Sequence, residues 1–391
     1  MRLLLVAPSR SYRVGDFLDA ALAMGCEVTV ASDAVSAIPG SFIPVSFDDP
    51  VAAGERLADL VGAVDGVVGT DGSAIVVAAE TARMLGLPAN AADALVAAGD
   101  KYRQRQAVEA AGVLQPSFAL LDGPAAPTTW SAFPAIVKPL DRSASQGVLR
   151  VDSPAELGEA VRTVGAIVGP GSSLLVEAFV PGIEVAVEGL VRGGRLDVVA
   201  VFDKPDSPQG PTFPETLLVS PARLAPDALD RVIEVVGRAV AAVGVAEGPV
   251  HVECKVKGGE VWFLELAART IGGLCGRALV PGGVSLEEVV VRHALGLSLP
   301  APPWRAAATG VLMLPVDETG KVEAVRGIDA AQAVEGVTDV VITVGAGEEV
   351  VALPAGDRYI GFVFARAETA DEAEAVLRSA WAEIEVEVTA S

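Results

Sequence analysis

The stretch that decides the fold is PVHVECKVKGGEVWFLELAAR (249–269). In its first half, valine or cysteine at every second position alternates with histidine or a charged residue, which is the pattern of a strand with one buried face. The Gly-Gly pair then predicts a turn, so that the two halves form a β-hairpin. We expect a three-residue turn at 257–259, which pairs Val252 with Leu264 and makes one face wholly apolar, because a two-residue turn would mix the two faces.

The polar face of this hairpin has a histidine and two carboxylates. In the expected register His251 lies opposite Glu265, and Glu253 and Glu265 are diagonal neighbours. Two carboxylates that close repel each other unless a cation lies between them. Hard oxygen ligands suit Mg²⁺ when it also contacts phosphate groups. The hairpin is therefore a candidate metal site, and a strand face that only meets solvent is the alternative.

The first hundred residues alternate apolar strands with helices. Strands are expected at 2–8, 27–32 and 66–70, and helices at 16–25, 52–62 and 73–86. This alternation predicts a Rossmann-like parallel sheet covered on both faces. Only Pro8-Ser9-Arg10 follows the first strand in place of a GxGxxG turn, which disfavours a dinucleotide-dependent oxidoreductase.

Lysine is rare in this chain, and one of its six lysines, Lys138, lies at the end of the apolar strand FPAIVKP (133–139). A charge there is costly without a partner. The loop SASQG (143–147) follows and offers backbone N–H groups and hydroxyls that suit phosphates. A lysine with a small-residue loop is a weak indication by itself, and the GxxxxGK[ST] pattern of a P-loop is absent.

A second apolar strand runs through LLVEAFVPGIEVAVEG (174–189). Its edge is suited to bind adenine through backbone hydrogen bonds, with Glu184 accepting hydrogen bonds from ribose hydroxyls. Taken alone, the stretch is equally a hairpin with surface glutamates.

Composition limits the classes of protein that the chain can represent. Its 391 residues suggest two to three domains, and 51% hydrophobic with 20% charged residues exclude a disordered chain. A net charge of −22 without a basic stretch argues against nucleic acid or an anionic membrane as a partner. The three cysteines (Cys26, Cys254 and Cys275) form no CxxC, and no apolar run reaches about 18 residues, so a disulfide framework, a zinc site and a membrane span are not expected. A cytoplasmic protein is the expectation.

The pieces resemble, in their order, the ATP-grasp superfamily over about residues 1–300. They are Asp100-Lys101 at a helix start, the V-K-P around Lys138, the small-residue loop, V-E-x-F-V-x-G-x-E (176–184) and H-x-E…L-E-L-A-A-R (251–269). The stretch E-L-A-A-R-x-x-G-G (265–273) and a separate C-terminal region resemble the carboxylate–amine ligases of the L-amino acid ligase type.

The resemblance implies an α/β plus α+β architecture in three domains. A pre-ATP-grasp domain would span 1–95, an ATP-grasp domain 96–300 with a lid at about 130–190, and a C-terminal α+β cap domain 301–391 after LPAPPW (299–304). In the cap, strands are expected near 309–315, 338–344 and 359–366, with a helix at 369–382.

The resemblance also implies a role for each matching residue. Arg269 would stabilise an acyl phosphate, and Glu253 and Glu265 would hold Mg²⁺ or Mn²⁺. The remaining matches would bind ATP through its phosphates, adenine or ribose: Lys101, Lys138, Ser143, Ser145, Gln146, Gly147, Glu177, Phe179, Val180, Glu184 and Leu264. Where many ATP-grasp enzymes have Asn there is Ala267, so the number of metal ions stays open.

The other candidates have weaker support. His251 either orients the acceptor or acts as a base, and a purely structural histidine is equally compatible with its position. Proximity in the family pattern alone suggests Lys204, Glu215 and Arg277 for the substrate pocket. No second base accompanies Cys275, which disfavours a nucleophile there.

The implied chemistry is transfer of a phosphoryl group from ATP to a carboxylate, followed by attack of an amine on the acyl phosphate. Such a reaction needs charge neutralisation and alignment more than a covalent residue. The partners would be a small-molecule carboxylate, such as an amino acid, and an amine, and the resemblance also allows a homodimer. Another ATP-grasp activity, of the carboxylase or purine-pathway type, and a non-catalytic ATP-sensing module are the alternatives.

Overall fold

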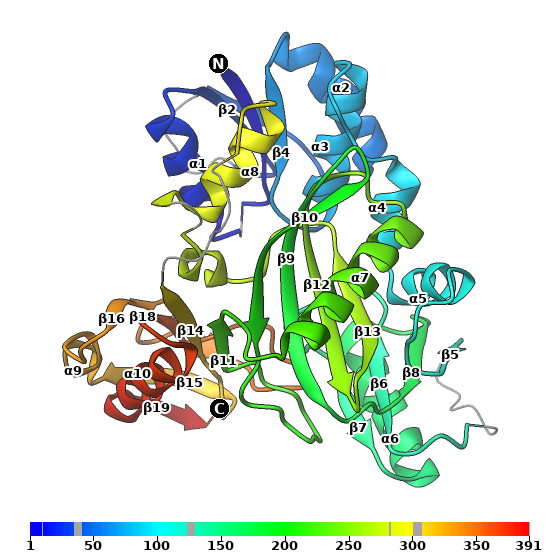
Figure 1. Ribbon diagram of the computed structural model, residues 1–391, viewed down its shortest axis with the longest axis vertical. Coiled ribbons are helices and arrows are strands. Elements are labelled where there is room, and N and C mark those ends of the chain that lie inside the picture. Colours follow the sequence, from blue (N-terminus) through cyan, green and yellow to red (C-terminus); the bar gives the residue numbers. More distant parts are fainter. Residues whose placement is uncertain (10, 35–40, 123–129, 281–282, 300–306, 391) are drawn as a thin grey trace.

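The structure is a computed structural model that describes residues 1–9, 11–34, 41–122, 130–280, 283–299 and 307–390 (Figure 1). A long central sheet connects an N-terminal α/β unit, a lid made of a second small sheet, and a C-terminal α+β unit. In Figure 1 the N-terminal unit lies at the top, the lid at the lower right and the C-terminal unit at the lower left. Apart from Leu299, the expected boundary at 299–304 lies outside the described residues.

The N-terminal unit is a parallel sheet in the order β3-β2-β1-β4. Its strands are β1 (Arg2–Val6), β2 (Glu27–Ser32), β3 (Ser41–Pro44) and β4 (Gly66–Gly69). Alternate residues of β1 enter two separate cores, Leu3 on one face and Leu4 on the other. The helices on the two faces are α1 (Val14–Ala23) and α8 (Leu286–Ala294), then α2 (Pro50–Val61) and α3 (Gly72–Met84). The predicted parallel sheet with helices on both faces is confirmed, whereas β3 and the packing of the distant helix α8 on this sheet were not predicted.

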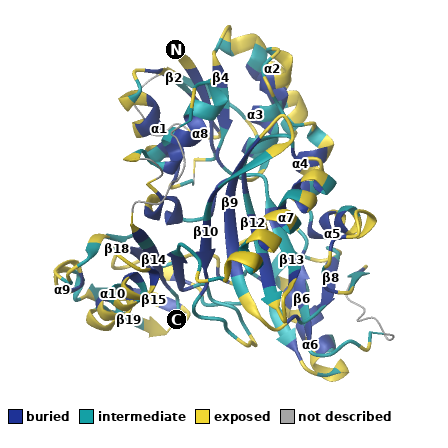
Figure 2. Cartoon of the chain, viewed as in Figure 1, coloured by how far each residue is buried: buried dark blue, intermediate teal, exposed yellow. Residues whose placement is uncertain are grey.

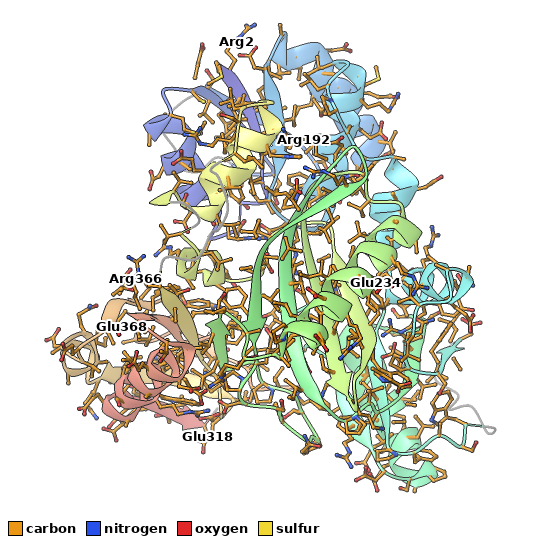
Figure 3. All side chains as sticks on the ribbon, viewed as in Figure 1. Arg2, Arg192, Glu234, Glu318, Arg366 and Glu368 are labelled. Atoms are coloured by element: carbon orange, nitrogen blue, oxygen red, sulfur yellow. The ribbon has the colours of Figure 1, made fainter. Side chains whose placement is uncertain are left out.

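The central sheet is antiparallel, in the order β13-β12-β9-β10-β11-β14-β18-β16. Its strands are β9 (Ile183–Arg192), β10 (Arg195–Asp203), β11 (Leu217–Ser220), β12 (Glu247–Lys257), β13 (Glu260–Ala267), β14 (Ala308–Leu314), β16 (Val337–Ile342) and β18 (Gly361–Ala367). Figure 2 shows that β9 is buried over most of its length, whereas β10 is buried mainly in its second half. The helix α7 (Pro226–Val243) covers one face with valines and alanines and turns Glu234 to its exposed side (Figure 3).

The hairpin β12–β13 has a different register from the expected one. Gly258 and Gly259 form a two-residue turn with φ of +58° and +86°, which suits the twist of a tight hairpin. A bulge at Leu264 then restores the alternation. The three-residue turn is therefore wrong, and so are the pairs built on it. The observed pairs are His251 with Ala267, Val252 with Leu266, Glu253 with Glu265, and Cys254 with Phe263.

The lid is a four-stranded sheet in the order β5-β8-β6-β7. Its elements are β5 (Phe118–Leu121), β6 (Ala135–Pro139), β7 (Leu149–Val151), α6 (Pro154–Val168) and β8 (Leu174–Ala178). Two further helices, α4 (Ala92–Ala98) and α5 (Lys101–Ala110), lead from the N-terminal unit to the lid. Lys138 thus ends an inner strand of the lid, as the sequence predicts.

The C-terminal unit adds a three-stranded sheet and two helices to the end of the central sheet. These elements are β15 (Gly320–Arg326), α9 (Ile328–Gln332), β17 (Glu349–Val350), α10 (Ala370–Glu383) and β19 (Glu385–Ala390). Outside this unit, a short 3₁₀ helix, η1 (Cys275–Ala278), lies between β13 and α8. Because β14, β16 and β18 extend the central sheet, the sheet crosses the expected limit at residue 300; the domain limits stay predictions. None of the helices in the described ranges has the length and apolar run needed to cross a membrane.

Candidate active site

A cavity of about 490 Å³ opens where all these parts meet. The N-terminal unit contributes Arg13 and Asp71, and the lid contributes Lys138 with the loop 143–145. The central sheet contributes the hairpin β12–β13, and the C-terminal unit closes the cavity from the remaining side. Residues from each of these parts therefore line the cavity.

Most of the predicted site residues line this cavity. They are Lys101, Lys138, Ser143, Ser145, Glu177, Phe179, Val180, Glu184, His251, Glu253, Leu264, Glu265 and Arg269. Gln146 and Gly147 do not: the Gln146 side-chain amide donates to the Ala355 carbonyl (2.7 Å), and the Gly147 N–H donates to the Pro354 carbonyl (2.7 Å). These two residues tie the glycine-containing loop to the C-terminal unit, and their contact with phosphates stays a prediction.

The beginning of α5 explains the Asp-Lys pair. Asp100 is the N-cap of the helix and accepts hydrogen bonds from the backbone N–H groups of Tyr102 and Arg103. The next residue, Lys101, turns towards the hairpin, where its Nζ lies 2.9 Å from a carboxylate oxygen of Glu265. Its Nζ also donates to the Arg142 carbonyl at the start of the lid loop (2.5 Å). Lys101 thus joins the second predicted metal ligand to the predicted phosphate loop.

One side of the cavity holds the cationic cluster, which we define as Arg105, Lys138 and Glu177. The Glu177 carboxylate lies 2.7 Å from Lys138 Nζ and 2.5 Å from Arg105 Nε. Burial alone would raise the pKa of Glu177, but the two cations hold it at about 2. Burial lowers the pKa of Lys138, and Glu177 opposes that shift. Arg105 was missed, although its spacing of four residues from Lys101 on one helix places both on the same face.

The adenine edge is only partly available as predicted. The Phe179 N–H donates to the Pro134 carbonyl (2.8 Å), so this residue presents its ring to the cavity rather than a free N–H. Arg150 lies over that ring at 4.7 Å from its centroid, and Lys255 lies at 5.4 Å. This end of the cavity is therefore aromatic and cationic.

The other side of the cavity holds the anionic cluster, which we define as Lys204 with Glu184, Glu215 and Glu253. Lys204 Nζ lies 2.9, 2.6 and 2.7 Å from the three carboxylates in that order. Burial alone would lower the pKa of Lys204, but the three carboxylates raise it well above its usual value. Burial raises the pKa of Glu215, whereas Lys204 and His251 hold that of Glu253 well below its usual range against burial.

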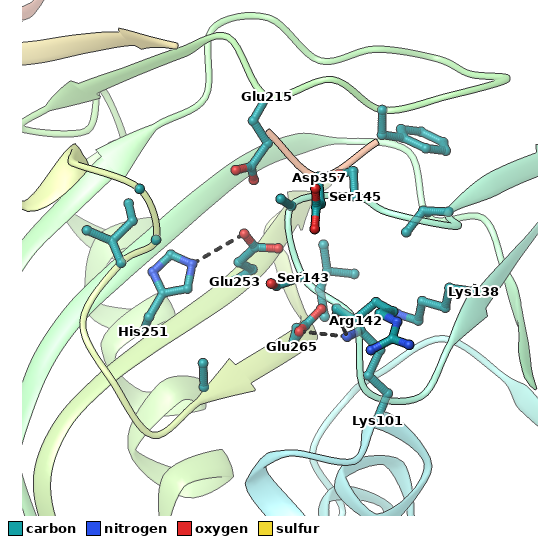
Figure 4. Close-up of a pocket in the computed structure, with 18 of the residues that line it drawn as sticks. Lys101, Lys138, Arg142, Ser143, Ser145, Glu215, His251, Glu253, Glu265 and Asp357 are labelled. Carbon is teal, nitrogen blue, oxygen red and sulfur yellow. Dashed lines mark hydrogen bonds and ion pairs between the residues drawn. The ribbon is translucent and has the colours of Figure 1, made fainter. Parts of the chain in front are cut away.

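Glu253 of this cluster and the neighbouring Glu265 fit a divalent cation in part. Glu253 and Glu265 lie directly opposite each other across the hairpin, and both line the cavity (Figure 4). Among the described residues, no group of three His, Cys, Asp or Glu side chains is arranged to hold a metal alone. Mg²⁺ usually takes one or two carboxylates and completes its shell with water and substrate phosphates. The donor set fits such an ion when it arrives with phosphates.

His251 is held between two glutamates. Its Nδ1 contacts the Glu188 carboxylate, and its Nε2 lies 3.4 Å from Glu253. Burial alone would lower the pKa of His251, but Glu188 and then Glu253 raise it to about 9. A histidine protonated at neutral pH is not a general base, so the arrangement favours its alternative, structural role. Glu188 was missed, although a charge inside the apolar run of β9 is the pattern that singled out Lys138.

The remaining candidates differ in whether they line the cavity. Glu215 lines the cavity, whereas Arg277 pairs with Asp16 (2.8 Å) and does not line it. Cys275 lines the cavity, but burial raises the pKa of its thiol, so it is not a thiolate nucleophile. Met313, Asp357 and Tyr359 of the C-terminal unit also line it, and no local pattern in the sequence could have found them.

Comparison with known families agrees with this geometry. The family described as "ATP-grasp domain" matches residues 131–278, and the family described as "L-amino acid ligase C-terminal domain 2" matches residues 312–389. A D-alanine–D-alanine ligase from Halorhodospira halophila is 30% identical over 223 residues, which cover 54% of this chain and 70% of that protein. The chain belongs to the ATP-grasp family.

Other curated relatives of this ATP-grasp protein are matched only in part. Human carnosine synthase 1 is 34% identical over 152 residues, covering 38% of this chain. The uncharacterized protein y4rH of Sinorhizobium fredii is 26% identical over 305 residues, covering 76% of this chain. The chain spans 18% of the length of carnosine synthase 1 and 63% of that of y4rH.

Solved structures match the whole chain. An L-amino acid ligase from Bacillus licheniformis superposes with a TM-score of 0.86 at 25% identity, covering 99% of this chain and 98% of that one. N5-carboxyaminoimidazole ribonucleotide synthetase from Thermotoga maritima has a TM-score of 0.74 at 18% identity and full coverage of both chains, which is a likeness of fold alone.

Proposed function

We propose that the chain is an ATP-dependent, ADP-forming carboxylate–amine ligase that acts on an amino acid. The observation that supports this most is that one cavity has a cationic cluster on one side, an anionic cluster on the other, and Arg269 beside them. A nucleotide with its divalent cation has the complementary charges. The two family matches, to an ATP-grasp domain and to an L-amino acid ligase C-terminal domain, support the same conclusion.

In this proposal the phosphates of ATP lie on the cationic side. Lys101 and Lys138 contact the α- and β-phosphates, and Ser143 and Ser145 approach the β- and γ-phosphates from the lid. Glu184 binds the ribose, and Glu177 with Val180 and Leu264 borders the adenine. Glu253 and Glu265 would hold Mg²⁺ or Mn²⁺, and such an ion would supply positive charge next to the phosphates.

The proposed reaction has two steps. A carboxylate oxygen of the first substrate attacks the γ-phosphorus, the bond from that phosphorus to the β-phosphate oxygen breaks, and an acyl phosphate and ADP form. The nitrogen of the second substrate then attacks the acyl carbon, the bond from that carbon to the phosphate oxygen breaks, and the nitrogen gives up a proton to the leaving phosphate. Arg269 stabilises the negative charge that develops on the acyl oxygen, a contribution that is typically worth about 10²–10³ in rate.

The lid and the C-terminal unit exclude water in this proposal. An acyl phosphate hydrolyses in water, so the site must be covered while it exists. The hydrogen bonds from Gln146 and Gly147 to the loop at Pro354 and Ala355 are the contacts that hold the cover in place. A cytoplasmic location and a homodimer belong to the proposal through the resemblance, and light scattering on the purified chain tests the dimer.

The test is phosphate release from ATP and Mg²⁺ with pairs of amino acids and small acids, with mass spectrometry of the products. We expect phosphate release together with a product whose mass equals the two substrates minus water. Phosphate release with bicarbonate alone would replace the proposal by a carboxylating activity. ATP binding without phosphate release for any pair would replace it by a non-catalytic ATP-sensing module. Arg277→Gln is the control, because Arg277 does not line the cavity.

A further inference from the structure

The segment after β13 is irregular, yet it positions Arg269 and is held from both sides by buried charged side chains. From β9, Glu188, which is 1% exposed, accepts a hydrogen bond from the Ile271 N–H (3.0 Å). From the N-terminal unit, Arg13, which is 5% exposed, donates from Nη1 to the carbonyls of Thr270 (3.1 Å) and Ile271 (3.1 Å). The same Nη1 donates to the Thr270 hydroxyl (2.8 Å). Both polar groups of the Ile271 backbone are thus fixed by charged partners.

The Thr270 carbonyl connects the hydrogen bonds of Arg13 to Arg269. Nη1 of Arg269 donates to that carbonyl at 2.8 Å, so one oxygen accepts hydrogen bonds from the guanidinium groups of Arg13 and Arg269. Arg269 is partly exposed and lines the cavity, and its side chain is long and flexible. The position of its guanidinium group therefore depends on where Arg13 and Glu188 hold the peptide between Thr270 and Ile271.

Arg13 is itself anchored at the other end. Its Nη2 donates to the Thr70 carbonyl (2.7 Å) at the end of β4 and contacts the Asp71 carboxylate. Asp71 also accepts a hydrogen bond from the Ser11 hydroxyl. Because burying a guanidinium group is costly unless it is paired and fully hydrogen-bonded, this arrangement is an expensive way to join two loops. Apolar residues of similar volume would join the two loops as firmly. The charged side chain therefore suggests that the orientation of the peptide it binds has to be fixed.

We propose that Arg13 and Glu188 are positioning residues that hold the Arg269 guanidinium group where charge develops on the acyl oxygen. The N-terminal unit then contributes a positioning residue to the site in addition to lining the cavity. The inference rests on the proposed ligase function. A displacement of about 1 Å in a positioning contact is enough to lower a rate by about 10²-fold.

The chain offers a matched control. Arg277 of η1 pairs with Asp16 of α1 at 2.8 Å, so this ion pair also joins the N-terminal unit to the segment after β13. It lies away from the cavity lining. Arg277→Gln therefore removes a contact between the same two parts without touching the Thr270 carbonyl.

The experiment compares Arg13→Met, Arg13→Lys, Glu188→Ala, Glu188→Gln and Arg277→Gln in the full chain. For each we would measure kcat and KM for ATP with the best amino acid pair, and the affinity for a non-hydrolysable ATP analogue with Mg²⁺ by calorimetry. Arg13→Met is expected to lower kcat by about 10²-fold with the analogue affinity unchanged within about two-fold. Arg13→Lys does not restore kcat, because one ammonium cannot replace the fork that reaches Thr270 and Thr70 together. Glu188→Gln restores most of the kcat lost in Glu188→Ala, because its oxygen still accepts from Ile271.

Several outcomes would overturn the inference. A wild-type kcat in Arg13→Met, full rescue by Arg13→Lys, or an equal fall of kcat in Arg277→Gln would each reduce these contacts to ordinary stabilisation. An equal fall in analogue affinity and kcat would do the same. If Arg13→Met does not fold, the comparison of Glu188→Ala with Glu188→Gln tests the inference. A wild-type chain that releases no phosphate defeats the proposed function, whereas an active wild type with unaffected variants defeats this inference alone.

Discussion

The two charged clusters of the cavity have opposite composition and opposite surroundings. In the cationic cluster two cations share one carboxylate, and the side chains of Arg105, Lys138 and Glu177 are 1%, 9% and 4% exposed. In the anionic cluster three carboxylates share one ammonium, and the side chains of Glu184, Glu215 and Glu253 are 23%, 29% and 20% exposed. The first cluster is almost fully buried and its charges are paired at short distances, so it adds to the stability of the fold as well as lining the cavity. The carboxylates of the second are more exposed and outnumber its one cation, which leaves negative charge for a bound cation to balance.

The largest effect should come from removing the shared carboxylate of the cationic cluster. Glu177→Gln leaves Lys138 and Arg105 buried without a counter-charge, and breaking a buried pair in this way typically costs about 3–5 kcal/mol. The matched change in the anionic cluster, Glu215→Gln, should change the free energy of unfolding by less than about 1 kcal/mol, because two carboxylates still face Lys204 and burial already disfavours the charge of Glu215. Urea unfolding monitored by circular dichroism measures both. Equal costs for the two variants would break the comparison.

The second effect is on activity and should occur without a matching loss of stability. Glu253→Gln removes one charged oxygen from the side proposed to hold the cation, and we expect phosphate release to fall by about 10²–10³-fold. Lys204 and His251 hold the pKa of Glu253 low, so its charge also stabilises the fold. Because Lys204 keeps Glu184 and Glu215 as partners, the urea midpoint should fall by less than in Glu177→Gln. Arg277→Gln is the control for both measurements. A fully active Glu253→Gln would remove this residue from the metal site.

The third effect is a difference in pH dependence between the clusters. The pKa of Glu177 is held at about 2, so its contribution to stability is present above its unfolded value near 4.5 and is lost as the pH falls towards 2. Between pH 6 and pH 3 this loss amounts to about 2 kcal/mol. The pKa of Glu215 is raised by burial, so its contribution has the opposite sign and favours the fold as the pH falls.

Urea unfolding at several pH values tests this difference. The dependence between pH 6 and pH 3 should become flatter in Glu177→Gln than in the wild type. In Glu215→Gln it should become steeper, because a group that gains protons in the folded state is lost. The same slope in both variants would contradict the difference between the clusters.

The sequence predicted the parts of these clusters that depend on local pattern. Lys138 was found because a charge at the end of an apolar strand needs a partner, and Glu253 and Glu265 because they share one face of a hairpin. The same reasoning applied to helix spacing would have found Arg105. The partners themselves were not predictable, since Glu177 reaches Arg105 across a sequence separation of 72 residues.

The hairpin register shows a different limit. The alternation of residues in 249–267 is compatible with a three-residue turn or with a two-residue turn and a bulge. The bulge at Leu264 decided the outcome, and its carbonyl accepts a hydrogen bond from Arg105 (2.6 Å), a contact from a distant helix. Met313 and Tyr359 were unpredictable for the same reason, because only the folded C-terminal unit brings them to the cavity.

The smallest effect concerns the lid loop, whose Ser143 and Ser145 lie between Glu253 and Lys138 in Figure 4. Gln146→Ala removes the hydrogen bond to the Ala355 carbonyl, and a single bond of this kind contributes about 0.5–1.5 kcal/mol. We expect KM for ATP to rise by up to about ten-fold, with kcat and the urea midpoint close to the wild type. The control is Gln209→Ala, in which another exposed amide loses a bond of 3.0 Å to the nearby Ser207 carbonyl. If both variants behave alike, the contact with the C-terminal unit does not hold the lid. If only Gln146→Ala weakens ATP binding, the cationic cluster and the anionic cluster are covered together by a loop that belongs to neither.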